Sequence, residues 1–172
     1  MERLGYLERI LNEYRKKFDI YENYKIDNEI IDAYGYFNSQ NEKYFLTREV
    51  QLWETREFEH IFFIQRENLN METLEKFLSF IPNKIEPDLI RRGKKYPDRN
   101  HMYSYVTLIF ITNNIDDIEM KKRIKKYKFE RNYLFLIRGY IQSRIVLIDL
   151  ERKEITTNKM GKKLEKLYKH FI

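Results

Sequence analysis

The feature that most restricts the fold is a run of ten residues, 103–112, in which β-branched, aromatic and aliphatic side chains follow one another almost without interruption. Asn100 precedes the run, and Asn113 and Asn114 follow it, which are residue types that end strands. A strand that is apolar on both faces is typical of a sheet covered on both sides. We therefore expect this run to be the middle strand of a single α+β domain spanning residues 1–172.

The chain before this run is expected to supply a helix and then a group of strands. Leucines and aromatic residues recur at steps of three and four over residues 2–18, which predicts an amphipathic helix. Period-two alternation then predicts an antiparallel meander of three strands, 30–38, 44–52 and 58–65. The sheet is expected to be mixed and mostly antiparallel, with the helices packed on it.

A second helix is predicted between the meander and the central strand. Asn70 is a favourable N-cap, and Pro82 is expected to end the helix because it has no backbone N–H to donate. Residues 83–100 contain three scattered helix breakers and many charges, so we expect a long polar loop there.

The chain after the central strand is expected to form two more helices and two more strands. Asp116 and Asp117 place negative charge where the dipole of a following helix favours it. The apolar pattern then predicts strands over residues 133–138 and 142–150 and a final helix over residues 160–171.

Composition limits the class of protein. The chain has 172 residues and no cysteine, so we expect no disulfide and no thiolate zinc site. The sequence has no run of 18 apolar residues, and charges occupy the N-terminus where a signal peptide needs an apolar core. We therefore expect a cytoplasmic protein with no membrane partner.

Charge is divided unequally along the chain. Residues 1–90 hold 12 Lys/Arg and 18 Asp/Glu, a net charge of −6, whereas residues 91–172 hold 21 and 9, a net charge of +12. This asymmetry favours an anionic partner for the second half, nucleic acid or an acidic protein. Self-association of acidic and basic halves is an alternative, and solvated surface lysine is another. The oligomeric state stays open.

Nucleic acid is the most specific of these partners, because basic segments alternate with tyrosines that could stack on bases. The basic segments are a loop, 91–99, and two helices, 121–128 and 162–169. The tyrosines nearest to them in sequence are Tyr96, Tyr103, Tyr127 and Tyr168. The expected nucleic-acid contacts are Arg91, Arg92, Lys94, Lys95, Lys121, Lys122, Lys125 and Lys126.

A metal-dependent nuclease of restriction-endonuclease-like type is the rival interpretation. Pro97-Asp98 precedes Glu119-Met120-Lys121, which matches the PD…ExK pattern of a Mg²⁺ site. The match is weak, because in that family both parts lie on adjacent strands, whereas Glu119 is expected to begin a helix. On the meander, no lysine stands two positions after a glutamate of the third strand. The carboxylates that such an enzyme could use are Glu49, Glu57, Glu59 and Asp98.

Other catalytic and metal-binding patterns are not apparent. His60, His101 and His170 lie on different predicted elements, so their spacing does not indicate a shared metal ion. The five glycines are isolated, which excludes a glycine-rich phosphate loop, and no glycine-flanked serine indicates a nucleophile. We expect no metal site, no cofactor and no catalytic residue, and therefore a non-catalytic binding or regulatory module.

Short motifs over nearly the whole chain resemble a family of small bacterial proteins known only as a domain of unknown function. These motifs are Glu42-Lys43-Tyr44, His101-Met102-Tyr103-Ser104-Tyr105, Gly139-Tyr140…Arg144…Leu147…Asp149-Leu150 and Thr157-Asn158-Lys159…Gly161-Lys162. The resemblance implies a compact cytoplasmic α+β protein and assigns no catalytic residue.

Overall fold

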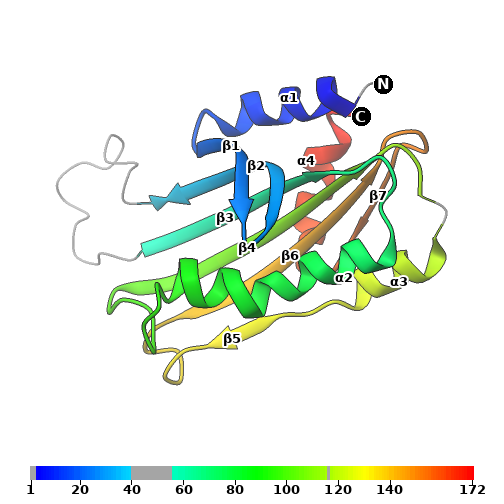
Figure 1. The fold of residues 1–172 in the computed structure, drawn as a ribbon. Helices are drawn as coiled ribbons and strands as arrows, with labels where there is room; N and C mark the ends of the chain where they lie inside the picture. Colours follow the sequence, from blue (N-terminus) through cyan, green and yellow to red (C-terminus); the bar gives the residue numbers. More distant parts are fainter. Residues whose placement is uncertain (1–2, 40–55, 116) are drawn as a thin grey trace.

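A computed structural model describes residues 3–39, 56–115 and 117–172 (Figure 1). Its elements, in chain order, are α1 (Arg3–Tyr14), β1 (Asp19–Ile26), β2 (Glu29–Asn38), β3 (Arg56–Gln65), α2 (Met71–Phe80), the π-helix η3 (Ile81–Ile90), β4 (His101–Thr112), α3 (Ile118–Lys126), β5 (Glu130–Asn132), β6 (Tyr140–Asp149), β7 (Glu154–Thr157), the 3₁₀-helix η4 (Gly161–Leu164) and α4 (Glu165–Lys169). The predicted α+β class is confirmed.

The sheet has the order β1-β2-β3-β4-β6-β5, and β7 pairs with the second half of β6. β4, the strand predicted to be central, lies between β3 and β6 and is parallel to both. The other four strand pairs are antiparallel, so the expectation of a mixed and mostly antiparallel sheet is confirmed. Parallel neighbours require crossovers, which α2 with η3 and then α3 provide.

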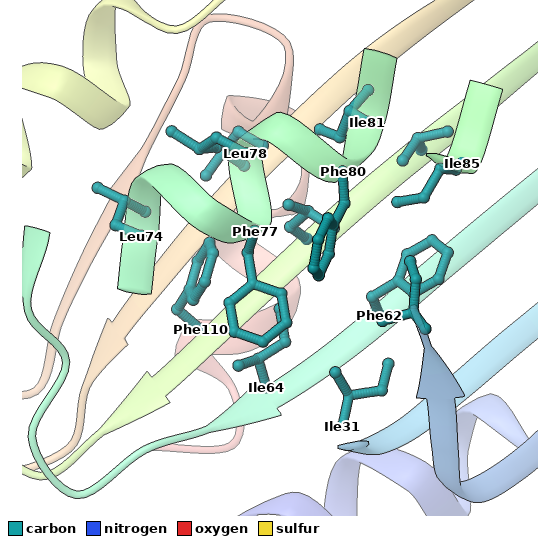
Figure 2. Packing of buried hydrophobic residues seen from close by; sticks show 14 of the residues in the cluster. Ile31, Phe62, Ile64, Leu74, Phe77, Leu78, Phe80, Ile81, Ile85 and Phe110 are labelled. Carbon is teal, nitrogen blue, oxygen red and sulfur yellow. The ribbon is translucent and has the colours of Figure 1, made fainter. Parts of the chain in front are cut away.

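Helices cover both faces of the sheet (Figure 1). One core lies between the sheet and α2, η3 and α3; Figure 2 shows Leu74, Phe77 and Phe80 gathered over Phe110 and Ile64. The second core lies on the opposite face, beneath α1 and α4. Successive side chains of β3 and β4 alternate between these two cores, which explains why both strands are apolar on both faces.

The meander differs from the prediction at its beginning. β1 was not predicted, because Ile20 and Tyr24 stand among exposed polar residues, yet it pairs with β2 across a two-residue turn at Asp27 and Asn28. Asp27 has φ = +54°, the left-handed conformation that tight hairpins require. The strand predicted over residues 44–52 lies outside the described residues.

The prediction of a long polar loop after the second helix is wrong for residues 83–90. The Asn70 side chain caps α2 by accepting from the Thr73 backbone N–H at 2.8 Å, as expected, and the α-helix ends at Phe80. The chain does not then become a loop but continues directly as η3, with Pro82 in its first turn. Ile81, Ile85 and Ile90 are buried against the sheet, and this packing holds the π-helix in place.

The second half contains two further corrections. Residues 134–138 form a turn instead of the predicted strand, and only the short β5 precedes them. The final helix is divided into η4 and α4, and its most deeply buried side chain is Tyr168, whereas Leu167 is 40% exposed. The prediction for α3 is confirmed: Asp117 caps it, and Met120 and Ile124 face the core.

Candidate functional site

A groove of about 310 Å³ lies between the β1–β2–β3 side of the sheet and the end of η3. We call it the tyrosine groove, and the residues that line it are Tyr21, Tyr24, Tyr34, Tyr36, His60, Asp88, Leu89 and Arg92. Four of these eight side chains are tyrosines from one hairpin. The groove therefore presents aromatic rings along one wall and charged groups from η3 and the following turn along the other.

Backbone geometry brings the tyrosines together. Tyr21 pairs with Tyr34 across the hairpin, so both side chains lie on the same face. Tyr24, three positions later, would point to the opposite face of a regular strand. Asn23 has φ = +50°, which interrupts the alternation, and Tyr24 faces the same groove. The ring centroids of Tyr24 and Tyr34 are 4.5 Å apart, and those of Tyr21 and Tyr34 are 5.9 Å apart and stacked.

A smaller pocket of about 20 Å³ adjoins the tyrosine groove and shares four of its lining residues, Tyr36 and His60 among them. His60 is 4% exposed, and its Nδ1 shares a 2.7 Å hydrogen bond with the Tyr34 hydroxyl. Burial lowers the pKa of His60 to about 3, so the imidazole is neutral at physiological pH. Its role is to fix the Tyr34 ring, because it is too deeply enclosed to meet a ligand.

His101 closes the far end of this pocket. Its Nδ1 donates to the Arg138 carbonyl at 2.7 Å, and its Nε2 accepts from the Ser104 hydroxyl at 2.8 Å. Burial lowers the pKa of His101, which favours this neutral form. A serine that donates to a histidine resembles an activated nucleophile. Ser104 is only 1% exposed, however, so the pair joins β4 to the turn before β6 and does not present a reactive hydroxyl.

Arg92 stands where the groove and the pocket meet. It follows η3 with φ = +51°, and Gly93 after it has φ = +71°, so the chain turns sharply at this point. The Arg92 side chain is 55% exposed and lies 3.7 Å from an Asp98 carboxylate oxygen. Its guanidinium is therefore oriented but still accessible to an anion.

The expected basic contacts of the 91–99 loop are distributed unevenly. Arg91 holds the fully buried Glu86 through a 2.8 Å ion pair and also donates to the Lys94 carbonyl, so its role is structural. Lys94 pairs with Asp98 at 2.8 Å, and its side chain remains 62% exposed. Lys95 is exposed and lies over the ring of Tyr96 at 5.4 Å. Arg92 at the end of the groove, and Lys94 and Lys95 after it in the loop, remain accessible.

The expected contacts on α3 lie elsewhere. Lys121 pairs with Glu154 at 2.6 Å and is mostly buried, and Lys122 pairs with Glu119 at 2.8 Å. Lys125 and Lys126 are exposed, and no ion pair joins either to a residue of the described ranges. α3 and the end of η3 lie at opposite ends of the same helical layer (Figure 1). The structure therefore does not join the loop and α3 into one basic surface.

The tyrosines expected to stack on bases are not the ones that line the groove. The prediction that Tyr168 lies on the surface is wrong, because this side chain is fully buried and its hydroxyl lies 2.6 Å from that of Tyr14. The Tyr127 hydroxyl donates to the Leu78 carbonyl at 3.1 Å. Tyr103 is half-buried and stacks on Tyr140 at 5.7 Å, on the sheet face opposite the groove. The tyrosines of β1 and β2 were missed because β1 was missed; the Asp-Asn turn after it was the sequence feature that could have revealed it.

The carboxylates considered for a nuclease do not converge. Glu59 lies on the α1 side of the sheet, where it pairs with Arg144 at 3.0 Å, and burial raises its pKa. Asp98 lines the small pocket on the opposite side, with Lys94 and Arg92 beside it. Within residues 3–39, 56–115 and 117–172, no three His, Asp or Glu residues are close enough to hold a metal ion. Glu49 lies outside the described residues.

Comparison with known proteins gives one match. A family model described as "Domain of unknown function (DUF8052)" matches residues 2–170. No curated protein matches the chain, and no solved structure does.

Proposed function

The chain belongs to the DUF8052 family, whose description names no activity, and we propose from the geometry of the tyrosine groove that it is a non-catalytic module that binds single-stranded nucleic acid. The observation that carries the proposal is the row of tyrosines from β1 and β2 that ends at Arg92. Aromatic faces beside accessible cations form the usual surface for unpaired nucleotides.

The aromatic wall supplies the sites for bases. Tyr21 is 51% exposed, and Tyr24 is half-buried beside it, so both present ring surface to a ligand. Tyr34 lies behind them, buried and held by His60, and keeps their rings in position. Stacking on such rings contributes about 1–3 kcal/mol per base and tolerates any base.

The opposite wall supplies polar contacts. Arg92 lines one end of the groove, and the exposed Lys94 and Lys95 follow it in the loop, so these cations can neutralise phosphates that flank a stacked base. Asp88, exposed on η3, can accept from the exocyclic amino group of a base. Paired bases have no free faces, so a duplex cannot use the tyrosines in this way.

The test is fluorescence anisotropy with labelled single-stranded DNA, single-stranded RNA and duplex DNA of one sequence, titrated with salt. We expect single strands to bind more tightly than duplex, with log affinity falling by about 0.7 per phosphate neutralised for each tenfold rise in salt. Tyr21→Ala and Arg92→Ala should each weaken binding. Tyr103→Ala is the matched control, because that tyrosine is half-buried on the opposite face.

Two results would contradict the proposal. Equal affinity of the parent and of the Tyr21→Ala variant would show that the groove is not the binding surface. Failure of nucleic acid to bind even at low salt would contradict it too, and an acidic protein would then be the next anionic partner to test.

A further inference from the structure

An apolar turn projects from the same end of the molecule as the 91–99 loop. It joins β5 to β6 and exposes three large hydrophobic side chains in succession: Phe135 is 98% exposed, Leu136 57% and Ile137 75%. We call residues 134–137 the apolar tip. Single exposed apolar side chains are common on protein surfaces. Three in succession form a contiguous apolar patch, which indicates a site that contacts a membrane or another molecule.

The backbone of the tip keeps these side chains outward. Leu134, Phe135 and Leu136 have φ values of +47°, +52° and +72°, in the left-handed region that large side chains seldom occupy. Backbone hydrogen bonds close the turn, among them Ile137 N–H to the Leu134 carbonyl at 3.0 Å. The apolar residues of this segment predict a strand over residues 133–138, in which every second side chain would be buried against the core. The observed turn exposes three of them together.

The base of the tip is anchored to the basic loop. Arg138 follows the tip, and its guanidinium donates to the Pro97 carbonyl at 3.3 Å, while its own carbonyl accepts from His101. The 91–99 loop and residues 128–138 together hold eight Lys/Arg and two Asp/Glu, a net charge of +6, and Glu86, which binds Arg91 and Arg131, lowers it to +5. Basic residues therefore flank the tip on the chain and in the contacting loop.

We propose that the apolar tip inserts into the surface of an anionic lipid bilayer, with the flanking lysines and arginines at the headgroups. Apolar side chains buried at the acyl boundary and cations at anionic headgroups are the two terms that hold peripheral proteins on membranes. A convex tip needs a fluid surface that can deform around it, because a rigid protein partner would need a matching cavity. No helix in the described ranges is long and apolar enough to cross a membrane, so contact would be at the surface.

The experiment is vesicle sedimentation with the full-length chain. The vesicles contain phosphatidylcholine alone or phosphatidylcholine with phosphatidylglycerol, at low and high salt. The test variant carries Phe135→Ser, Leu136→Ser and Ile137→Ser. The control variant is Ile118→Ser, because Ile118 is 65% exposed at the start of α3, at the opposite end of the helical layer. Circular dichroism of each variant verifies that the sheet is retained.

We expect the parent chain to sediment with anionic vesicles, to be released by high salt, and to lose at least tenfold in partitioning when the tip is changed. The Ile118→Ser control should partition like the parent. Failure of the parent to bind anionic vesicles at low salt overturns the proposal. Equal partitioning of the tip variant overturns it too, because charge alone would then account for binding. Light scattering that shows a dimer of the parent and a monomer of the tip variant would assign the tip to self-association instead.

Discussion

The Tyr34 hydroxyl lies 2.7 Å from Nδ1 of His60, and the two residues come from adjacent antiparallel strands, β2 and β3. His60 is enclosed by aromatic rings, with the Tyr36 ring centroid 5.2 Å and the Tyr34 ring centroid 6.0 Å away. The hydrogen bond joins the floor of the tyrosine groove to the core of the sheet. A change in the charge of His60 should therefore affect both stability and binding.

Stability should fall as the pH is lowered below 6.5. Burial depresses the folded-state pKa of His60 to about 3, whereas the unfolded chain takes up the proton near pH 6.5. The unfolded state then binds more protons, so the contribution of His60 is complete above pH 6.5 and is lost progressively toward pH 3. Between pH 6.5 and 5 the loss for one such histidine is about 2 kcal/mol. Urea unfolding at several pH values measures this loss in the free energy of unfolding. In a His60→Asn variant, that free energy should depend less steeply on pH. An unchanged slope in that variant would contradict the assignment.

Removing the Glu86 carboxylate should destabilise the fold without a direct effect on the groove. Glu86 is fully buried on η3, and it binds Arg91 at 2.8 Å, Arg131 at 2.9 Å and the Tyr133 hydroxyl at 2.6 Å. Glu86→Ala leaves these groups without their acceptor, and we expect a loss of about 3 kcal/mol in the free energy of unfolding. Asp88→Ala, an exposed acidic residue of the same helix, is the control and should cost little stability. Similar unfolding midpoints for the two variants would contradict this account.

The Asn70 cap should contribute about 1 kcal/mol to stability. Its side chain accepts from the Thr73 backbone N–H at 2.8 Å and satisfies one of the free donors at the start of α2. Asn70→Ala should therefore lower the free energy of unfolding by about 1 kcal/mol, whereas Asn70→Gly should lower that free energy by only a few tenths of a kcal/mol. Chemical denaturation of the three proteins side by side tests the difference; the alanine variant matching the parent would rule out the cap.

Charge reversal should separate the two basic regions. Lys94→Glu with Lys95→Glu changes the 91–99 loop, which reaches the groove at Arg92, and Lys125→Glu with Lys126→Glu makes the same change of charge on exposed lysines of α3. We expect the loop variant to bind a short single strand at least tenfold more weakly and to show a smaller salt dependence. The α3 variant should bind it nearly as well as the parent, because α3 lies at the other end of the layer. Equal losses in both variants would favour a diffuse basic surface over the groove.

Features that depend on neighbours within a few residues were predictable from the sequence. The apolar pattern identified β4 as the central strand, and the short polar side chains of Asn70 and Asp117 identified the starts of α2 and α3. Each of these predictions depends either on the apolar pattern within one strand or on a hydrogen bond between residues three positions apart. The residues that decide each feature are therefore close together in the sequence.

Tertiary structure decided the rest. The groove needs the register of β1 on β2 and the packing of η3 across the sheet, and neither is set by local pattern. Tyr168 is buried because it meets Tyr14, 154 positions away, which no helical periodicity reveals. The apolar tip is exposed because β5 is short and the chain must turn before β6 pairs with β4. In each case the free energy of distant contacts exceeds the local preference, and those contacts exist only once the sheet has formed.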